Sequence, residues 1–441
     1  MERLALAELR RWKARPARKP LIVRGARQVG KSWLVREFAR LEYRRLVYVN
    51  FDESRAAADV FAQDLDVSRI LDQLALIDGG GPITPDDTLL FFDEIQGCPR
   101  AVSALKYFAE RLPSCQVIGA GSLLGVALHE GASFPVGKVE FLDLGPMTFS
   151  EFLGAFGRGD LAEALRGDLA SIAPLHTIYA DHLRWYYYVG GMPEAVAAFV
   201  DSRDTGEVRR IQRQVLDGYD RDFSKHAPPA QVPKLRELYE SLPAQLGRED
   251  KKFRYGLAHP GARGRDYEAV LRWLEDAGLA RRVFRVTAPR LPLRAYEDRN
   301  AFKLFGTDVG LLGAQSELAA VTLTTPSDVF TEFKGALTEQ YVLQHLAHAD
   351  LGPHYWSSDT GTAEVDFVLA QGDRVLPVEV KAERNLRAKS LRVYADKYSP
   401  ALSVRVSMSP FHTQPGLVDL PLYAIEALPD VLARTGTTGE H

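Results

Sequence analysis

The chain has 441 residues, of which 46% are hydrophobic and 26% are charged, and its formal net charge is −3. This length excludes a single ordinary domain and favours two to four, while the composition is that of soluble globular proteins. The near-neutral balance excludes nucleic-acid binding driven by overall charge, so any basic binding surface has to be local.

The first 19 residues alternate Leu and Ala with Arg and Glu, which predicts an amphipathic helix rather than a signal peptide. No apolar run is long enough to span a bilayer, so we expect no membrane partner. The two cysteines, Cys98 and Cys115, lack metal-site spacing, and we expect no disulfide framework. These features predict a cytoplasmic protein in a reducing compartment.

A phosphate-binding loop follows the first predicted strand. Residues 25–32, Gly-Ala-Arg-Gln-Val-Gly-Lys-Ser, match the P-loop pattern between an apolar strand at 21–23 and a helix at 33–40. Its glycines let backbone N–H groups curl around phosphates, and the helix N-terminus adds partial positive charge. We expect Lys31 to reach the β- and γ-phosphates and Ser32 to ligate Mg²⁺. The residues expected to bind ATP are Gly25, Ala26, Arg27, Gln28, Val29, Gly30, Lys31, Ser32 and Trp33.

An acidic pair ends a later buried strand. A second strand is expected at 46–50, a helical region extends from there to about residue 77, and an apolar strand at 88–92 runs into Asp93 and Glu94. This pattern is typical of a Walker B strand, in which Asp93 would hold Mg²⁺ and the catalytic Glu94 would polarise the attacking water. The alternative is a strand that simply ends in solvated acids, and the P-loop upstream disfavours it.

The strand at 114–121 ends at Ser122. In many P-loop ATPases such a strand lies beside the Walker B strand, so Ser122 is a candidate catalytic residue that senses the γ-phosphate. Ser122 is equally a candidate N-cap for a helix at 123–128, and both roles stay open. Strands that alternate with helices predict a parallel sheet with helices on both faces and the nucleotide at the carboxyl ends of the strands.

Several of these motifs together resemble one family. They are Arg24 to Ser32, Phe92-Asp-Glu-Ile-Gln96, Gly121-Ser122, Gly145-Pro-Met-Thr-Phe-Ser-Glu-Phe152 and Tyr188-Val-Gly-Gly-Met-Pro-Glu194, and they are similar to the AAA+-type prokaryotic P-loop ATPases. The resemblance covers nearly the whole chain. It implies an ATPase core, a helical lid, a winged-helix module and a C-terminal domain of unknown function.

The same resemblance implies assembly into a ring or a dimer, in which an arginine acts on the nucleotide of a neighbouring copy. Lys138 stands where many members carry that arginine, which weakens the expectation. Arg100 and Arg111 are unranked alternatives, and a solvated surface charge is the other interpretation of each.

Helices are predicted from about residue 150 to 200, and their aromatic run Trp185–Tyr188 is expected to pack in a core rather than stack on bases. Asp220-Arg-Asp222 is either a charged helix end or a polar switch between domains.

Helices at 233–246 and 267–276, followed by a basic alternating strand at 279–286, predict a winged-helix module. A winged helix serves either DNA contact or protein contact, and both stay open. The cluster that would contact phosphates is Arg281, Arg282, Arg285, Arg290 and Arg294.

A second constellation lies in the C-terminal part. Glu339 is on a predicted helix at 334–346, Asp366 on a strand, and Glu379 and Lys381 on one face of the next strand. This arrangement resembles a PD-(D/E)XK nuclease, and Tyr355-Trp356, Glu364-Val-Asp-Phe367 and Glu379-Val-Lys381 resemble the C-terminal domain of the same ATPase family. The resemblance implies that Asp366 and Glu379 bind Mg²⁺ and that Lys381 positions the nucleophilic water or stabilises the phosphorane, with Glu339 as the helix-borne acid.

A basic helix follows, with Arg384, Arg387, Lys389 and Arg392, which either hold a DNA or RNA backbone or form a solvated face.

The sequence therefore predicts an α/β protein with ATP and Mg²⁺ as cofactors. We expect an ATPase whose nucleotide state controls the nuclease-like domain. The alternative is an ATP-switched regulator that binds nucleic acid or protein through an inactive nuclease fold. The expected domains are the ATPase core at 1–145, the lid at 146–204, the winged-helix module at 205–294, the nuclease-like domain at 295–428 and a flexible tail at 429–441.

Overall fold

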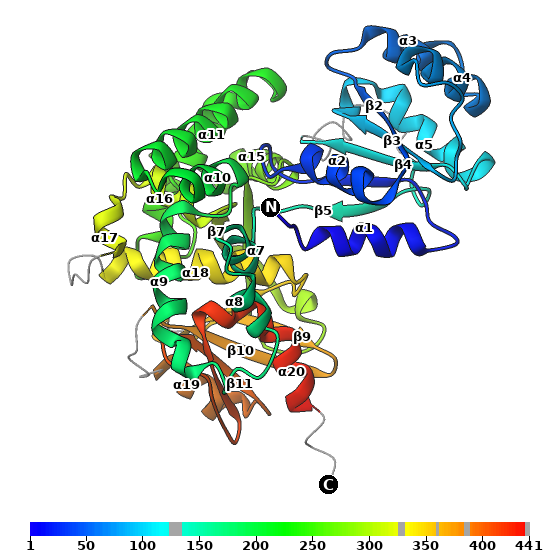
Figure 1. Cartoon of the computed structure of the whole chain (residues 1–441). Coiled ribbons are helices and arrows are strands. Elements are labelled where there is room, and N and C mark those ends of the chain that lie inside the picture. The colour runs from blue at the N-terminus through cyan, green and yellow to red at the C-terminus, as the bar shows by residue number, and fades with distance from the viewer. Residues whose placement is uncertain (123–134, 325–330, 359–360, 383–388, 437–441) are drawn as a thin grey trace. The chain divides into compact units, whose positions relative to one another are not determined.

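The computed structural model of the chain describes residues 1–122, 135–324, 331–358, 361–382 and 389–436 (Figure 1). It forms two compact units. The N-terminal unit comprises residues 2–145 and 273–279, and the C-terminal unit comprises residue 1, 146–272 and 280–441. The predicted helix at 123–128, Arg384, Arg387 and the last five residues of the predicted tail lie outside the described residues.

A parallel sheet forms the centre of the N-terminal unit. Its described strands have the order β2-β3-β4-β1-β5, and every neighbouring pair is parallel. The expected α/β architecture is confirmed, and β4 lies beside the strand that ends in Asp93. The strands are β1 (Leu21–Arg24), β2 (Arg45–Asn50), β3 (Thr88–Asp93), β4 (Gln116–Gly121) and β5 (Glu140–Asp143).

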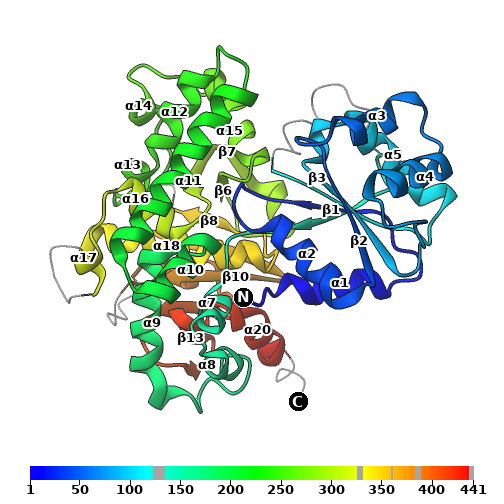
Figure 2. The same cartoon turned by 45° about the horizontal axis from the view of Figure 1, so that its top comes forward.

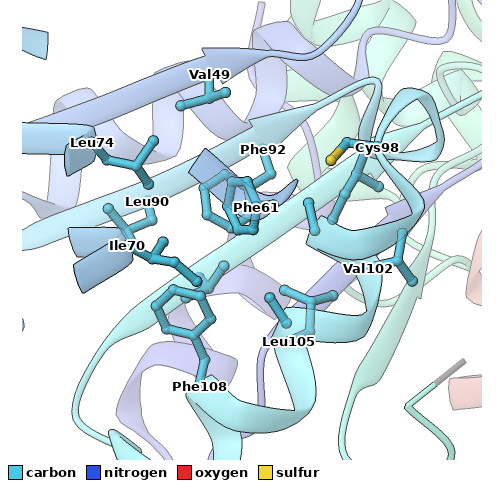
Figure 3. Packing of buried hydrophobic residues seen from close by; sticks show 14 of the residues in the cluster. Val49, Phe61, Ile70, Leu74, Leu90, Phe92, Cys98, Val102, Leu105 and Phe108 are labelled. Carbon is cyan, nitrogen blue, oxygen red and sulfur yellow. The ribbon is translucent and has the colours of Figure 1, made fainter. Parts of the chain in front are cut away.

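Helices cover both faces of this sheet. They are α1 (Ala5–Ala14), α2 (Lys31–Glu42), α3 (Arg55–Gln63), α4 (Val67–Asp78) and α5 (Pro99–Arg111). Figure 3 shows one face, where the rings of Phe61 of α3 and Phe108 of α5 contact Phe92 of β3 and Leu74 of α4 belongs to the same cluster. Successive residues of β3 point to opposite faces, so a strand buried on both sides is apolar throughout, as residues 89–92 are. This core fixes where β3 delivers its terminal acids.

The predicted amphipathic helix at the N-terminus is α1, which buries Leu6, Leu9 and Trp12. Cys98 and Cys115 are both free and buried. Among the described residues, no helix is both long enough and apolar enough to cross a bilayer.

The C-terminal unit begins with helices. They are α7 (Phe149–Ala155), α8 (Gly159–Ala164), α9 (His176–Val189), α10 (Pro193–Ser202), α11 (Thr205–His226), α12 (Val232–Glu240), α13 (Leu242–Leu246), α14 (Tyr255–Ala258) and α15 (Gly264–Asp276), and α15 ends in the N-terminal unit. The single helix expected at 233–246 is wrong, because α12 ends before Ser241. Pro243 cannot lie inside a continuous helix, because its ring would clash with the carbonyl group four residues earlier. In α9, Tyr186, Tyr187 and Tyr188 are buried, so this aromatic run packs in the core as expected.

A mixed sheet occupies the rest of this unit. Its described strands have the order β12-β13-β11-β10-β9-β8-β6-β7. The hairpin β6–β7 joins the later strands through the parallel pairing of β6 with β8, so one sheet crosses the expected module boundary between residues 294 and 295. The strands are β6 (Ala280–Val286), β7 (Glu297–Gly306), β8 (His354–Ser357), β9 (Glu364–Gln371), β10 (Arg374–Val380), β11 (Ser403–Ser407), β12 (His412–Gln414) and β13 (Leu417–Pro421).

The helices that accompany this sheet are α16 (Val309–Gln315), α17 (Ala320–Thr324), α18 (Thr331–His348), α19 (Lys389–Tyr398) and α20 (Leu428–Gly436). Helix α18 contacts both β7 and β10, and Figure 2 shows it beside the sheet. It therefore brings the helix-borne Glu339 to the strands that carry Asp366 and Glu379.

Two buried hydrogen-bond networks connect the early helices of this unit to the later ones. The Asp308 carboxylate accepts from Leu311 N (3.0 Å) at the start of α16 and from Gly191 N (2.7 Å) between α9 and α10. Gly190 has φ +72°, and a Cβ on it would lie 2.1 Å from Asp308 Oδ1. The turn therefore needs glycine both for its backbone conformation and for space.

The second network holds the start of α7. Phe149 N donates to His345 Nε2 of α18 (3.1 Å), and Ser150 N donates to Glu426 Oε1 (2.8 Å). Thr148 and Glu151 complete a capping box at the same helix end. The four first N–H groups of a helix have no partner within it, so these side chains satisfy donors that burial would otherwise leave unpaired.

Candidate functional site

The P-loop forms a tight turn between β1 and α2. Gly25 has φ +147°, and a Cβ there would lie 2.1 Å from Leu144 O. Gly30 has φ +91° and precedes the first residue of α2. These two positions allow the backbone to turn back on itself and to aim N–H groups at the α2 N-terminus, where an anion is favoured. Gln28 also has positive φ (+67°), which is uncommon for a residue with a side chain.

Lys31 folds back over its own loop. Its Nζ donates to Gly25 O (2.9 Å) and Ala26 O (2.8 Å), and the side chain is buried. The ammonium is therefore held at the loop by carbonyl oxygens, close to where the loop N–H groups gather. Ser32 is partly buried in the first turn of α2, whereas the next residue, Trp33, is 43% exposed.

The two acids at the end of β3 are held by neighbouring side chains. Asp93 is buried, and its carboxylate accepts from Tyr48 Oη of β2 (3.1 Å) and from Glu94 N (3.1 Å). Glu94 adopts left-handed backbone geometry (φ +47°), and its carboxylate accepts a hydrogen bond from Gln96 Nε2. Sequence reasoning did not assign roles to Tyr48 and Gln96. Gln96 lies within the motif 92–96, whereas nothing in the sequence distinguished Tyr48.

Ser122 follows β4 and is 4% exposed. Within the described part of the chain, its Oγ has no hydrogen-bond partner. A buried hydroxyl without a partner costs free energy, so its position needs an explanation. A phosphate oxygen at this edge of the sheet would provide a partner.

Strand order brings these groups to one edge. β4 lies between β1 and β3, and Gly121 pairs with Arg24 while Gly119 pairs with Phe92. Because the strands are parallel, the P-loop, the Asp93–Glu94 pair and Ser122 all follow carboxyl ends of adjacent strands. This is the edge at which open α/β sheets bind ligands.

The three cations considered for a role in a neighbouring copy are all engaged in their own unit. Lys138 Nζ pairs with Glu110 Oε1 (2.9 Å), Arg100 Nε donates to Phe61 O, and the Arg111 guanidinium lies 4.9 Å from the ring centroid of Tyr107. Action on a neighbour's nucleotide stays a prediction.

The expected basic cluster around β6 is partly neutralised. Arg282 pairs with Glu268 (2.9 Å), and Arg285 lies 3.9 Å from Asp298. Arg281, Arg290 and Arg294 are exposed. Fewer charges than the sequence suggested are therefore available to contact phosphates.

The structure brings the four residues of the C-terminal constellation together. Asp366 of β9 and Glu379 of β10 are on neighbouring antiparallel strands, and the charge of Glu379 raises the pKa of Asp366. Asp366 Oδ2 accepts from Val380 N (2.8 Å), and Glu379 Oε1 pairs with Lys381 Nζ (2.7 Å). Glu339 of α18 interacts electrostatically with both carboxyl groups.

Two lysines and a glutamate that sequence reasoning missed complete this acidic cluster. Lys303 Nζ of β7 lies 2.6 Å from Glu364 Oε1, 3.4 Å from Glu339 Oε2 and 3.9 Å from Asp366 Oδ1, and its side chain is fully buried. Lys251 Nζ pairs with Glu339 Oε1. The available signal was a lysine in the otherwise apolar run 301–305, since a buried strand rarely contains an unpaired charge.

Burial and charge act against each other in the acidic cluster. Burial raises the pKa of Glu339, but Lys251 and Lys303 outweigh it and lower the pKa to about 2. Burial, together with the charges of Glu339 and Glu379, raises the pKa of Asp366 well above its usual value. Burial alone would lower the pKa of Lys303, but the surrounding carboxylates raise it well above its usual value.

The donor set in part suits a divalent cation. Glu379 Oε2 is buried without a hydrogen-bond partner in the described chain, and Asp366 supplies a second carboxylate on the adjacent strand. Carboxylate oxygens are the ligands that Mg²⁺ prefers. No group of three or more His, Cys, Asp or Glu side chains arranged to hold a metal occurs within the described ranges. Asp366 and Glu379 are therefore the residues that would hold a cation here, as a pair and not as a closed cage.

Three family models match successive parts of the chain. Residues 17–153 match an AAA domain, residues 180–322 match a domain of unknown function (DUF8612), and residues 334–424 match another domain of unknown function (DUF4143). The first match covers the P-loop, Asp93, Glu94 and Ser122, and it supports ATP binding and hydrolysis at the family level. A search of curated proteins found no match.

Solved structures similar to the chain are distant in sequence. The Walker-type ATPase PABY2304 of Pyrococcus abyssi is 15% identical with a TM-score of 0.45, over 70% of this chain and 94% of that one. The Aeropyrum pernix ORC1 protein in complex with DNA is 15% identical (TM-score 0.26), over 72% of this chain and 93% of that one. Cdc6p from Pyrobaculum aerophilum is 12% identical (TM-score 0.25), over 72% of this chain and 92% of that one.

Proposed function

We propose that the N-terminal unit binds ATP with Mg²⁺ and hydrolyses the β–γ phosphoanhydride bond, and that the nucleotide state controls the acidic cluster of the C-terminal unit. The observation that carries the first part is the meeting of the P-loop, Asp93 with Glu94, and Ser122 at the carboxyl ends of three adjacent parallel strands.

Each residue has a distinct part in the reaction. The loop N–H groups and the α2 N-terminus bind the phosphates, and Lys31 leaves the carbonyls of Gly25 and Ala26 for phosphate oxygens. Ser32 and Asp93 would hold Mg²⁺, which neutralises charge on the β- and γ-phosphates. Glu94 first breaks its hydrogen bond with Gln96. Its carboxylate then orients the attacking water and accepts a proton from that water. The Ser122 hydroxyl donates a hydrogen bond to a γ-phosphate oxygen.

Phosphate release from ATP tests this function. We expect Lys31→Ala to weaken ATP binding at least about tenfold, because it removes a charge-assisted contact to phosphate. We expect Glu94→Gln to bind ATP normally but to release phosphate about 10²- to 10⁴-fold more slowly, because it lacks the base. Normal turnover in Glu94→Gln would contradict the assignment.

Chain connectivity supports control of the C-terminal unit by nucleotide. β5 pairs with β1, the strand that leads into the P-loop, and α7 starts six residues after β5 ends. The N-terminus of α7 is hydrogen-bonded to His345 of α18, the helix that carries Glu339. A γ-phosphate that shifts β1 or β5 could thus bias α18, provided that it binds the two states with different affinity.

For the acidic cluster we propose metal-dependent cleavage of a phosphodiester in DNA or RNA. The cation held by Asp366 and Glu379 would activate water. Lys381, 32% exposed and paired with Glu379, would stabilise charge on the phosphate. The test is cleavage of single- and double-stranded DNA and RNA, read on a gel. We expect cleavage to be lost in Asp366→Ala and Glu379→Ala, and equal cleavage in both variants and the unmodified chain would contradict this activity.

A second candidate function is nucleotide-switched binding of nucleic acid or protein without cleavage. The neutralisation of the acidic cluster by Lys251, Lys303 and Lys381 favours it, because a cluster already compensated attracts a divalent cation less. Its signature is ATP-dependent affinity for a partner that survives Asp366→Ala. Equal partner affinity with and without ATP would exclude it.

A further inference from the structure

The acidic cluster contains its own cations. Its four carboxylates are Glu339, Glu364, Asp366 and Glu379, and its lysines are Lys251, Lys303 and Lys381. Three lysine ammonium groups thus accompany four carboxyl groups. Lys381 belongs to the motif recognised from sequence, whereas Lys251 and Lys303 come from an earlier part of the chain.

Lys303 is a permanent part of the cluster. Its side chain is fully buried, and carboxylate oxygens of Glu364 and Glu339 lie 2.6 and 3.4 Å from Nζ. Burial of an ammonium is costly unless the charge is paired, so these carboxylates are what allows a lysine in the middle of β7.

Lys251 is held less deeply. It lies in the segment 247–254 between α13 and α14, and its side chain is 12% exposed. The segment is anchored two residues later, where Phe253 N donates to Phe302 O (2.7 Å) and the Phe253 ring stacks on the Phe302 ring with 5.1 Å between centroids. Because Phe302 adjoins Lys303 in β7, this anchor places the segment that carries Lys251 beside the strand that carries Lys303, and both lysines pair with Glu339.

We propose that Lys251 and Lys303 are resident counter-ions that compete with a divalent cation for the acidic cluster, and that withdrawal of Lys251 from Glu339 opens the cluster to the cation. This inference rests on the proposed function of the cluster and adds its regulation. The physical reason is that an ammonium bound to a carboxylate both occupies its oxygens and repels a second cation. Lys251 is the displaceable one, since it reaches the surface and its backbone is not part of the sheet.

The test is Mn²⁺ binding by the full chain without nucleotide, measured by calorimetry. Every protein carries Asp93→Asn, so that the nucleotide site lacks the carboxylate expected to hold Mg²⁺ there. Lys251→Met keeps the aliphatic stem and removes the charge, and Lys252→Met is the matched control, because Lys252 is the next residue and its side chain is exposed. We expect Lys251→Met to bind Mn²⁺ at least about tenfold more tightly than the chain that carries Asp93→Asn alone. Lys252→Met should bind Mn²⁺ with the same affinity as that chain.

A second change locates the effect. Addition of Glu339→Gln to Lys251→Met should abolish the gain, because Glu339 is the carboxylate that Lys251 releases. Lys251→Gln serves as a replacement should Lys251→Met fold poorly, and urea unfolding of each variant reports folding. Mn²⁺ affinity in Lys251→Met and Lys251→Gln equal to that of Lys252→Met would overturn the inference.

Cleavage is measured separately, so the two proposals fail separately. Tighter Mn²⁺ binding in Lys251→Met without cleavage of DNA or RNA supports the counter-ion role and contradicts the nuclease activity. Cleavage that depends on Asp366 while Lys251→Met leaves Mn²⁺ affinity unchanged supports the nuclease activity and overturns the counter-ion role.

Discussion

At the scale of single residues, the candidate nucleotide site combines buried groups that have hydrogen-bond partners with others that have none in the described chain, among them the Ser122 hydroxyl. Asp93 has two hydrogen-bond donors and Lys31 has two acceptors, whereas the Ser122 hydroxyl is buried and has no partner in the described chain. A group that contributes nothing to the resting structure but stays buried is best explained by a bound ligand that pairs with it.

This contrast leads to a prediction for Ser122→Ala. The substitution removes an unsatisfied hydroxyl, so we expect the free energy of unfolding to stay within about 0.5 kcal/mol or to rise. Phosphate release should fall at least about tenfold, because the γ-phosphate loses a hydrogen bond. Chemical denaturation and a phosphate assay measure the two effects.

Thr148→Ala provides the matched control. Thr148 is also a buried hydroxyl, but it caps α7 and accepts from Glu151 N (3.3 Å). Its loss should cost about 1 kcal/mol of stability and leave phosphate release nearly unchanged. A stability loss in Ser122→Ala equal to that in Thr148→Ala would argue that Ser122 is a structural residue.

At the scale of elements, the turn between α9 and α10 depends on a fit between Gly190 and Asp308. Alanine at position 190 would need left-handed backbone geometry and a Cβ 2.1 Å from a carboxylate oxygen. We expect Gly190→Ala to destabilise the C-terminal unit by about 1–3 kcal/mol. Gly154→Ala is the control: Gly154 is within α7, and a Cβ there would meet no atom within 4 Å. It should stabilise by up to about 1 kcal/mol. Urea unfolding compares them, and equal stability would contradict the proposed fit.

The same carboxyl group gives the unit a pH dependence. Burial raises the pKa of Asp308 to about 6, although N–H groups of Gly191, Leu311 and Gly310 and the amide of Gln344 oppose the shift. The folded pKa lies above the ordinary value of 3.8, so its stabilising contribution is complete below about pH 4 and is lost as the pH rises through 6. The shift corresponds to about 3 kcal/mol.

The measurement is the free energy of unfolding between pH 4 and 7 for the unmodified chain and for Asp308→Asn, which does not titrate. We expect the difference between the two to fall by about 3 kcal/mol across this range, relative to its value at pH 4. A difference independent of pH would show that Asp308 titrates near its ordinary value when folded.

The meeting of the candidate nucleotide-site residues could be predicted from sequence patterns, because these residues are contiguous or end strands of one parallel sheet. Gly25 to Ser32, Asp93 and Ser122 needed only strand order to be brought together. The acidic cluster was predicted in part: Glu339, Asp366, Glu379 and Lys381 follow a recognisable pattern. Lys251 and Lys303 were missed because they reach the cluster through the pairing of β6 with β8, a non-local contact that no local pattern specifies.

At the scale of the whole molecule, the proposed control of the C-terminal unit by nucleotide would act through the chain itself. The test uses Glu94→Gln, which we expect to bind ATP without hydrolysing it. In this variant, ATP should change amide hydrogen exchange in residues 145–155 and 334–348, because α7 and α18 are hydrogen-bonded at His345. Lys31→Ala is the control and should show no change. Identical exchange with and without ATP in Glu94→Gln would contradict control of the C-terminal unit by nucleotide.

The continuous sheet from β7 to β12 also limits where recombination between genes can divide the chain without disrupting its fold. A genetic crossover near residue 295 would separate β6 from both of its neighbours, β7 and β8, and leave each product with an exposed strand edge, which invites aggregation. It would also separate Lys251 from Glu339, so that one product carries an uncompensated carboxylate. A crossover near residue 145, between β5 and α7, divides no strand pairing. Exchange of modules between genes is therefore expected at that junction, and residues 205–294 should travel with the strands that follow them.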